Sequence, residues 1–464
     1  MNITKFVDRQ LELKELKNLE ELSQKKLFVI AIYGLRRVGK TRLLLEFLKN
    51  RGIYFFVNKN KTSKDLLHEF QQILKTKKIL GEIETLSSWD KFFEIATTRQ
   101  LPPIVFDEFQ NFIEVEPSIF GTLQKNIDLH ENNQGLIILS GSLIGLMKKL
   151  FQQTKEPLYG RIKRANKINP LSISSCFEIG KELNLQNEEL LKLYLLFGGY
   201  PKYYVTIEDF DLKGKTASDI IDALFFCSGA PLEEEVSVIL AQEFGGRSGV
   251  YYSILEAIAM GNNRLSSIAG YLNVPATSLT RQINELKNHF ELIELEMPFS
   301  GKRGIYAIKH PLLEFWFSQI YKNFSDYASR NPEFIKKTKE NLNSYYGRAF
   351  ERVAREFLVS KLGLVKAQRQ WGKIPFVGKG KNEYEIDLIG SNKDGFYIFE
   401  FKWAELNYTE AIKILNGLVA KAKFVQRLQT NLIFGIVAKK IIEKDKLRAA
   451  NYLAFDLDDL SLRP

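Results

Sequence analysis

The stretch that most constrains the fold runs from residue 27 to residue 50 and reads LFVIAIYGLRRVGKTRLLLEFLKN. Its first part, Leu27–Tyr33, is an apolar and β-branched run, which is typical of a strand buried on both faces. Its last part, residues 41–50, is rich in Leu, Arg, Glu and Lys, which are good helix formers. Further apolar runs alternate with helical patterns downstream, so the sequence predicts a mostly parallel α/β sheet covered by helices.

The turn between this strand and this helix has the spacing of a phosphate-binding loop. Residues 34–41 read GLRRVGKT and fit G-x-x-x-x-G-K-[ST] at every fixed position. The two glycines allow successive N–H groups to point at phosphate oxygens, and the following helix N-terminus favours negative charge. A plain turn with a surface lysine is the alternative. The pattern predicts ATP and Mg²⁺ as ligands, with Lys40 on the β- and γ-phosphates, Thr41 on the metal, and these binding residues: Gly34, Arg36, Arg37, Val38, Gly39, Lys40, Thr41 and Arg42.

Two carboxylates end another apolar strand. Residues 101–108 read LPPIVFDE. Asp107 is suited to hold Mg²⁺ through water, and Glu108 is suited to activate an attacking water. An acidic helix N-terminus after a strand is the alternative, but the upstream phosphate loop favours the catalytic interpretation.

Two segments supply further catalytic candidates. Residues 135–142 predict a buried strand ending in hydroxyls, and parallel strands end at one sheet edge, so Ser140 or Ser142 would lie beside the nucleotide. Arg161 belongs to a basic cluster at 157–164 and is a candidate contact to the γ-phosphate, in cis or in the site of a neighbouring subunit. A tight turn of small residues and a solvated basic face are the respective alternatives.

Together these motifs resemble a known family. The stretches FVDRQLEL, GLRRVGKTRLL, IVFDEFQ, LIILSGS and LYLLFGGYPKYY are similar to those of the archaeal ATPase family, STAND-type relatives of the AAA+ proteins. The resemblance covers most of residues 1–310. It implies nucleotide roles for Lys40, Thr41, Asp107 and Glu108. It also implies that the GGYP element at 198–201 lies in a helical lid and couples nucleotide state to domain arrangement. At the N-terminus, Asp8 is expected to cap the first helix.

Residues 250–310 have the spacing of a winged helix-turn-helix. Helices are expected at 251–260, 265–272 and 278–290, followed by wing strands at 291–297 and 304–309. On the wing, Lys302 and Arg303 would meet phosphate. Winged helix-turn-helix modules also serve as rigid spacers or protein contacts, so DNA binding and these other roles all stay open. Four polar residues of the third helix recur at intervals of three and four and would face a major groove: Thr280, Arg281, Asn284 and Lys287.

Residues 384–402 predict a charged hairpin. Period-two counting places Glu400 and Lys402 on one face, and the turn at 392–395 brings Asp387 near them. The spacing resembles the D-(x)n-E-x-K core of PD-(D/E)XK nucleases. This resemblance implies that Asp387 and Glu400 bind Mg²⁺, that Lys402 polarises water or the scissile phosphate, and that Glu351 adds a helix-borne carboxylate. An ordinary charged face on a half-buried hairpin is the alternative.

The length, charge and cysteine count of the chain add to what these motifs indicate. A chain of 464 residues exceeds one ordinary domain, and a net charge of +11 favours nucleic acid or an acidic partner. The absence of an apolar run of about 18 residues and the presence of only two cysteines lead us to expect no membrane span and a cytoplasmic setting. We expect five segments: a P-loop AAA+-type αβα ATPase domain at 1–170, a helical lid at 171–245, the winged helix-turn-helix at 250–310, a helical connector at 311–340, and an α/β restriction-endonuclease-like domain at 341–464.

The function that fits these features is that of an Mg²⁺-dependent, ATP-hydrolysing molecular switch acting on or near DNA. Two alternatives stay open. One is an ATP-gated DNA nuclease that uses the C-terminal domain, and the other is a non-cleaving DNA-binding regulator with ATP as its signal. The sequence leaves open whether the chain forms a homo-oligomer.

Overall fold

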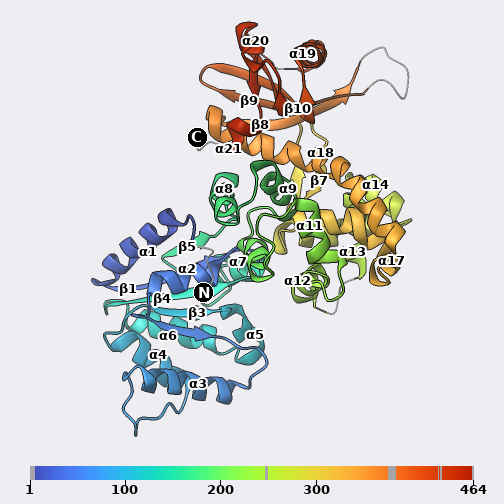
Figure 1. Cartoon of the computed structure of the whole chain (residues 1–464). Helices are drawn as coiled ribbons and strands as arrows, with labels where there is room; N and C mark the ends of the chain where they lie inside the picture. Colours follow the sequence, from blue (N-terminus) through green and yellow to red (C-terminus); the bar gives the residue numbers. More distant parts are fainter. Residues whose placement is uncertain (1–5, 246–248, 375–382, 427, 429–430, 462–464) are drawn as a thin grey trace.

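The computed structural model describes residues 6–245, 249–374, 383–426, 428 and 431–461. Figure 1 shows the chain in three tiers: an N-terminal α/β part in blue and cyan, a central helical part in green and yellow, and a C-terminal sheet with helices in orange and red.

The N-terminal sheet has five strands in the order β2-β3-β4-β1-β5, and all its pairings are parallel. The expectation of an α/β fold with a parallel sheet is therefore confirmed. Because β4 lies between β1 and β3, the ends of all three strands meet at one edge of the sheet. The strands are β1 (Leu27–Tyr33), β2 (Ile53–Phe56), β3 (Ile104–Asp107), β4 (Gly135–Gly141) and β5 (Arg164–Lys167).

Helices cover both faces of this sheet (Figure 1). Alternate residues of β1 point to opposite faces: Ile30 and Ile32 pack in one core with α1 and α2, while Val29 and Ala31 pack in a second core with α3, α4, α6 and α7. These elements are α1 (Gln10–Ser23), α2 (Lys40–Leu48), α3 (Ser63–Thr76), α4 (Trp89–Thr98), η1 (Phe109–Asn111), α5 (Phe112–Val115), α6 (Ile119–Leu129) and α7 (Ile144–Gln152).

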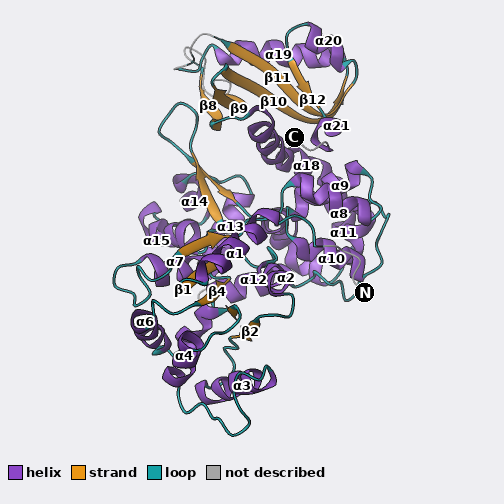
Figure 2. Cartoon of the chain, turned by 90° about the vertical axis from the view of Figure 1, so that its left-hand side faces the viewer, coloured by secondary structure: helices purple, strands orange, loops and turns teal. Residues whose placement is uncertain are grey.

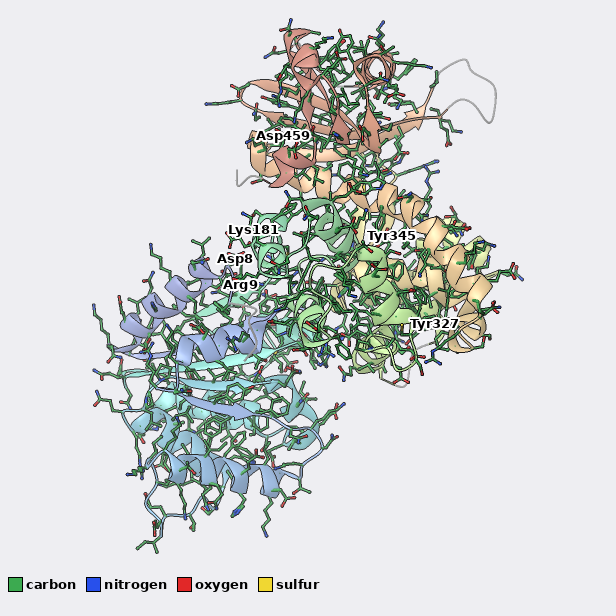
Figure 3. All side chains as sticks on the ribbon, in the orientation of Figure 1. Asp8, Arg9, Lys181, Tyr327, Tyr345 and Asp459 are labelled. Carbon is green, nitrogen blue, oxygen red and sulfur yellow. The ribbon has the colours of Figure 1, made fainter. Side chains whose placement is uncertain are left out.

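The entry to α1 differs from the prediction. Arg9 occupies the N-cap position with φ 70°, and no side chain caps the helix. Asp8 instead accepts hydrogen bonds from the backbone N of Arg9 at 2.8 Å and from Ser175 Oγ at 2.6 Å. The expectation that Asp8 caps α1 is therefore wrong, since its carboxylate ties the N-terminus to α8 (Figure 3).

The central part packs helices into one continuous core with the N-terminal sheet. Its first helices are α8 (Ile173–Glu182), α9 (Asn187–Phe197), α10 (Pro201–Asp209), α11 (Ala217–Ile221), η2 (Asp222–Phe226) and α12 (Glu235–Phe244). Three helical segments and a two-stranded antiparallel hairpin follow: α13 (Gly249–Ala259), α14 (Leu265–Tyr271), a third segment that passes from η3 (Ala276–Leu279) through α15 (Thr280–Asn284) to η4 (Glu285–His289), and then β6 (Ile293–Glu296) with β7 (Ile305–Ile308).

The long helix α18 (Pro332–Leu362, 31 residues) joins the central part to the C-terminal sheet. Its Tyr345 donates to the backbone oxygens of Leu195 and Pro311, both at 3.2 Å (Figure 3). The predicted division at 340/341 falls inside this helix, and residues 246–248, between the predicted lid and the predicted winged helix-turn-helix, lie outside the described residues. No described helix is both long and apolar enough to cross a membrane. Before α18 come α16 (Pro311–Phe315), η5 (Trp316–Ile320), η6 (Tyr321–Asn323) and α17 (Phe324–Ala328).

The C-terminal sheet has the order β12-β11-β10-β9-β8. The predicted hairpin forms with Gly395 paired to Asn392, and β10 pairs in parallel with β11 after the crossover helix α19. Figure 2 shows helices packed against both faces of this sheet. The elements are β8 (Lys366–Lys373), β9 (Glu383–Asn392), β10 (Gly395–Leu406), α19 (Tyr408–Ala422), β11 (Leu432–Ile441), α20 (Lys444–Ala449), β12 (Leu453–Phe455) and α21 (Leu457–Ser461).

Candidate nucleotide site

The backbone of residues 34–41 turns tightly between β1 and α2. Gly39 has φ 91°, a left-handed conformation that favours glycine. A Cβ on Gly34 would lie 2.4 Å from the backbone oxygen of Ile168, so only glycine fits there. Gly39 is thus required by its backbone conformation, and Gly34 is required by the close approach of Ile168.

Lys40 is held over this loop by backbone carbonyls. Its Nζ donates to Gly34 O at 2.9 Å and to Leu35 O at 3.1 Å, and the residue is 6% exposed. Burial lowers the pKa of Lys40, while the negative charges of Glu108 and Asp107 oppose that shift. The ammonium therefore lies within electrostatic reach of both predicted acids.

Asp107 lies at the centre of a hydroxyl network at the carboxyl edge of the sheet. Its Oδ2 accepts from Thr41 Oγ1 at 2.6 Å and from Tyr54 OH at 2.8 Å, and its Oδ1 accepts from Ser140 Oγ at 2.8 Å. Ser140 therefore contacts Asp107, behind the loop. A hydroxyl and a carboxylate are oxygen donors of the kind that Mg²⁺ prefers, so Thr41 and Asp107 fit this ion. No sequence pattern pointed to Tyr54, which reaches Asp107 from β2.

Glu108 is positioned by two polar neighbours. Its Oε2 accepts from Ser142 Oγ at 2.8 Å and from Gln110 Nε2. Its φ of 55° is a left-handed conformation, and such strain at a non-glycine residue is concentrated at functional sites. Gln110 follows the acidic pair by two residues and packs against Gly141, where a Cβ would lie 2.4 Å from its Oε1.

A cavity of about 760 Å³ opens in front of the loop. Its polar lining includes Lys40, Thr41, Arg42, Glu108 and Ser142. A cavity with both polar and apolar lining suits a ligand that has phosphates and an apolar ring. The apolar lining consists of Phe6, Val7, Leu171, Ile179, Pro201 and Val205.

Arg36 and Arg37 pair with acids of α12. Arg37 Nε lies 2.9 Å from Glu235 Oε1, and Arg36 Nε lies 3.4 Å from Glu243 Oε1. Burial raises the pKa of Glu243 to about 7, although Arg36 and Lys40 favour its charged form. Both arginines line the cavity, yet their guanidinium groups bind protein carboxylates in this structure.

Arg161 is not near the loop. Its guanidinium pairs with Asp128 through two contacts of 2.9 Å. Lys163, two residues on, donates to Val29 O near the start of β1, whereas the phosphate loop follows the end of that strand. The predicted contact with a γ-phosphate in cis is therefore wrong, and a contact with a neighbouring subunit stays a prediction.

The GGYP element packs directly on the phosphate loop. A Cβ on Gly39 would lie 3.6 Å from Pro201 Cγ, and Gly199 O accepts a hydrogen bond from Leu171 N at 2.7 Å. Tyr200 stacks on His310 with ring centroids 4.0 Å apart. Burial lowers the pKa of His310 to about 3, so this ring is neutral. The stack links the residues beside the loop to the start of α16.

A second polar cluster lies on β9 and β10. Asp387 Oδ2 accepts from Phe401 N at 2.7 Å, and Lys402 Nζ donates to Glu400 Oε1 at 2.9 Å. Lys421 of α19, which sequence reasoning missed, also donates to Glu400 Oε1 at 3.0 Å. Burial and then the charge of Glu400 raise the pKa of Asp387. The predicted hairpin thus brings Asp387, Glu400 and Lys402 together.

Glu351 belongs to a neighbouring ion pair. Its Oε2 lies 3.4 Å from Arg369 Nη2, and burial raises its pKa to about 7. Within the described ranges, no group of three or more His, Cys, Asp or Glu side chains is arranged to hold a metal ion. This corrects the predicted set of three carboxylates, because Glu351 pairs with Arg369 and Glu400 pairs with two lysines.

The parallel sheet, the glycine loop and the acidic strand end define an ATP-binding ATPase. The chain belongs to the family of ATPase domains found predominantly in Archaea, whose sequence model matches residues 6–207. An uncharacterized protein of Methanocaldococcus jannaschii is 32% identical over 474 residues, which cover 98% of this chain and 100% of that protein. An uncharacterized ATP-binding protein of Pyrococcus horikoshii is 27% identical over 237 residues, 43% of this chain and 73% of that protein. A second model, of archaeal and bacterial proteins of unknown function, matches residues 316–414.

Two solved structures are similar to this chain. The Walker-type ATPase of Pyrococcus abyssi has a TM-score of 0.50 at 22% identity, over 67% of this chain and 96% of that chain. The Aeropyrum pernix ORC2 protein in its ADPNP–ADP complexes has a TM-score of 0.47 at 13% identity, over 72% and 95% of the two chains. The similarity to the Pyrococcus abyssi ATPase confirms an ATPase fold, and it extends beyond the N-terminal sheet.

Proposed function

We propose that this chain is an Mg²⁺-dependent, ATP-hydrolysing switch that acts on or near DNA. The observation that carries the proposal is the 2.6 Å hydrogen bond between Thr41 and Asp107, which joins the two expected metal ligands beside Glu108. When bound there, Mg²⁺ neutralises charge on the β- and γ-phosphates. The cavity of about 760 Å³ provides room for the nucleotide.

The residues of the loop have distinct roles in this proposal. Lys40 exchanges its two backbone acceptors for phosphate oxygens, and the loop N–H groups bind the same phosphates. Glu108 accepts a proton from the attacking water, and Ser142 and Gln110 fix its orientation. Arg161 would act only in the site of a neighbouring copy, which requires a homo-oligomer.

In this proposal the helical lid, residues 171–245, transmits conformational changes from the nucleotide site to the rest of the chain. Pro201 packs on Gly39, and Tyr200 stacks on His310, which immediately precedes α16. A shift of the loop on nucleotide binding or hydrolysis is therefore passed to α16 and to the neighbouring α18. This is the sense in which the chain acts as a switch.

Two variants test the ATPase proposal. Lys40→Ala should abolish ATP binding, whereas Glu108→Gln should bind ATP and fail to hydrolyse it. Binding of a fluorescent ATP analogue and release of phosphate measure the two steps separately. Glu94→Gln on α4, whose carboxylate pairs with Lys91 away from the loop, is the control. Wild-type turnover in Glu108→Gln would remove Glu108 from the role of base.

The DNA part of the proposal concerns residues 250–310, predicted to form a winged helix-turn-helix. Thr280, Arg281 and Asn284 are exposed on the third helical segment, and Arg281 pairs with Glu285 at 3.0 Å. The net charge of +11 supports an anionic partner. Arg281→Ala combined with Lys287→Ala should weaken duplex DNA binding and reduce its salt dependence. Unchanged binding would favour a spacer role for this module.

A nuclease is the second candidate, favoured by the proximity of Asp387, Glu400 and Lys402. A carboxylate pair beside a lysine is the chemistry of metal-assisted phosphodiester cleavage. Asp387→Ala and Lys402→Ala should then abolish DNA cutting and spare ATP hydrolysis. If the wild-type chain cuts no DNA with Mg²⁺ or Mn²⁺, the chain is instead a non-cleaving regulator with ATP as its signal.

A further inference from the structure

A groove of about 700 Å³ separates the hairpin β6–β7 from the C-terminal sheet. One wall is the loop after β6, residues 298–303, together with Asn263 and Arg264. The other wall consists of β8 and the start of β9, residues 369–373 and 383–385. Figure 2 shows this loop reaching from β6 and β7 up to β8 and β9.

The two walls are fixed to each other. Phe299 N donates to Arg369 O at 2.9 Å, and Ser300 N donates to Gln370 Oε1 at 2.8 Å. Below them, Arg355 of α18 binds Glu296 of β6 at 3.2 Å. The loop is therefore docked on the sheet through its backbone, and the groove is a built feature shared by two parts of the chain.

Four of the five cations that line the groove have no carboxylate partner among the described residues. Among the described residues, no ion pair or side-chain hydrogen bond involves the side chains of Arg264, Lys302, Arg303 or Lys373, and all four are exposed. The fifth cation, Arg369, is different because Glu296, Glu351 and Glu385 surround it. Glu383 is the remaining acid of the lining, so the groove keeps an excess of positive charge.

An aromatic ring lies among these cations. Trp371 of β8 is half-buried and lines the groove between Arg369 and Lys373. The usual site for a single nucleic-acid strand has cations along the path of the phosphate backbone and an aromatic ring on which a base stacks. A volume of about 700 Å³ gives room for a few nucleotides of one strand.

We propose that this groove binds one strand of nucleic acid, with its phosphodiesters on Arg264, Lys302, Arg303 and Lys373 and a base stacked on Trp371. The inference rests on the DNA part of the proposed function and specifies its ligand. The groove also leads toward the acids of β9. Glu385 lines it, and Asp387 lies two residues further on the same face of the strand. A strand held here would pass beside Arg369 toward that cluster.

The test uses the full chain and labelled oligonucleotides of twelve nucleotides, as single-stranded DNA, single-stranded RNA and duplex DNA, followed by fluorescence anisotropy at several salt concentrations. The variant Lys302→Glu/Arg303→Glu/Lys373→Glu should bind single strands at least tenfold more weakly. Its salt slope should fall by about 2, since three phosphate contacts are lost. Trp371→Ala should weaken single-strand binding about tenfold with an unchanged salt slope.

A matched control has the same change of charge elsewhere. Lys14, Lys17 and Lys25 are exposed at or just after α1, and their replacement by Glu should leave strand affinity within about twofold of wild type. Melting temperature and the ATPase rate without nucleic acid show that each variant is folded.

The outcomes separate the two proposals. If the wild-type chain binds strands and the groove variants bind them equally well, the groove assignment is overturned while the DNA part of the proposed function stands. If the wild-type chain binds no nucleic acid, the groove assignment and the DNA part of the proposed function are both wrong. If the groove variants lose duplex binding as much as single-strand binding, the assignment to one strand is wrong. Loss of duplex binding alone in Arg281→Ala/Lys287→Ala would support two distinct sites.

Discussion

Arg36 of the phosphate loop lies 3.4 Å from Glu243 of α12, measured from Nε to Oε1. The neighbouring Arg37 pairs with Glu235 at the start of the same helix, so two adjacent arginines of the loop are held by one helix. Nucleotide phosphates are anions that compete with carboxylates for guanidinium groups. Any ligand that draws Arg36 toward phosphate therefore weakens the contact between the loop and α12.

The first prediction concerns this competition. Glu243→Gln removes the competing carboxylate, and ATP affinity should increase about fivefold, which corresponds to about 1 kcal/mol. Calorimetric titration of ATP measures the change. Glu46→Gln is the control, because Glu46 on α2 pairs with Lys49 at the surface. A loss of affinity in Glu243→Gln would show that Glu243 holds Arg36 in its binding position.

The second prediction concerns acid stability. Burial opposes the ionisation of Glu291, but hydrogen bonds from Lys148 and Lys167 and the charge of Lys309 outweigh it and hold its pKa at about 2. A carboxyl whose folded pKa is depressed stabilises the fold above its unfolded pKa of about 4.5, and this contribution is lost as the pH falls through about 2. Because Lys148 comes from α7 and Lys167 from β5, the cluster joins the N-terminal part to the β6–β7 hairpin.

Glu291→Gln should therefore lower the melting temperature at pH 7 and have little further effect near pH 2. The expected loss at pH 7 is about 2 kcal/mol, less than the full shift because Lys148 and Lys167 are partly exposed and solvent screens their charge. Melting curves from pH 2 to pH 7 for both proteins measure it. Parallel curves over the whole range would contradict the assignment to Glu291.

The third prediction concerns the GGYP element. A Cβ on Gly199 would lie 1.8 Å from Leu171 O, a clash with backbone that no rotamer change relieves. Gly199→Ala should lower stability by about 3 kcal/mol or more and weaken ATP binding, because α10 carries Pro201 away from the loop. Gly121→Ala is the matched control, since its Cβ would meet nothing within 4 Å on α6 and should stabilise slightly. Equal melting temperatures of the two variants would refute this account.

The features that the sequence predicts well are local. The strand Leu27–Tyr33, the glycine turn and α2 follow one another directly, and each is determined by its own residue pattern. The hairpin that brings Asp387 to the strand of Glu400 is also local, since its turn sets the register. The domain boundary predicted at 340/341 falls inside helix α18. The apolar face of this helix contacts first the central helices and then the C-terminal sheet, so no change of composition marks where one part ends and the next begins.

Contacts between distant residues were not predictable from patterns. Arg37 and Glu235 are 198 positions apart, and a charged residue in a phosphate loop gives no sign that a protein carboxylate binds it. The short strand β5 was missed because its sequence, RANK, is polar and its edge position requires little burial. The partner of Asp107 on β2 was missed because the strand order brings Tyr54 to β3, and a single sequence does not reveal which strands are neighbours.

The last prediction concerns that partner. Tyr54 donates to Asp107 Oδ2 at 2.8 Å, and burial followed by the charge of Asp107 raises the pKa of Tyr54, so its hydroxyl stays a donor at any working pH. Groups that orient a metal-binding carboxylate commonly change metal affinity by about 10- to 100-fold when removed. Tyr54→Phe should therefore raise the Mg²⁺ concentration for half-maximal ATP hydrolysis about tenfold, while ATP binding without Mg²⁺ changes little. Phosphate release measured across a Mg²⁺ titration tests this, with Tyr159→Phe at an exposed position as control. A lower melting temperature with an unchanged Mg²⁺ requirement would mean that Tyr54 supports the sheet and not the metal site.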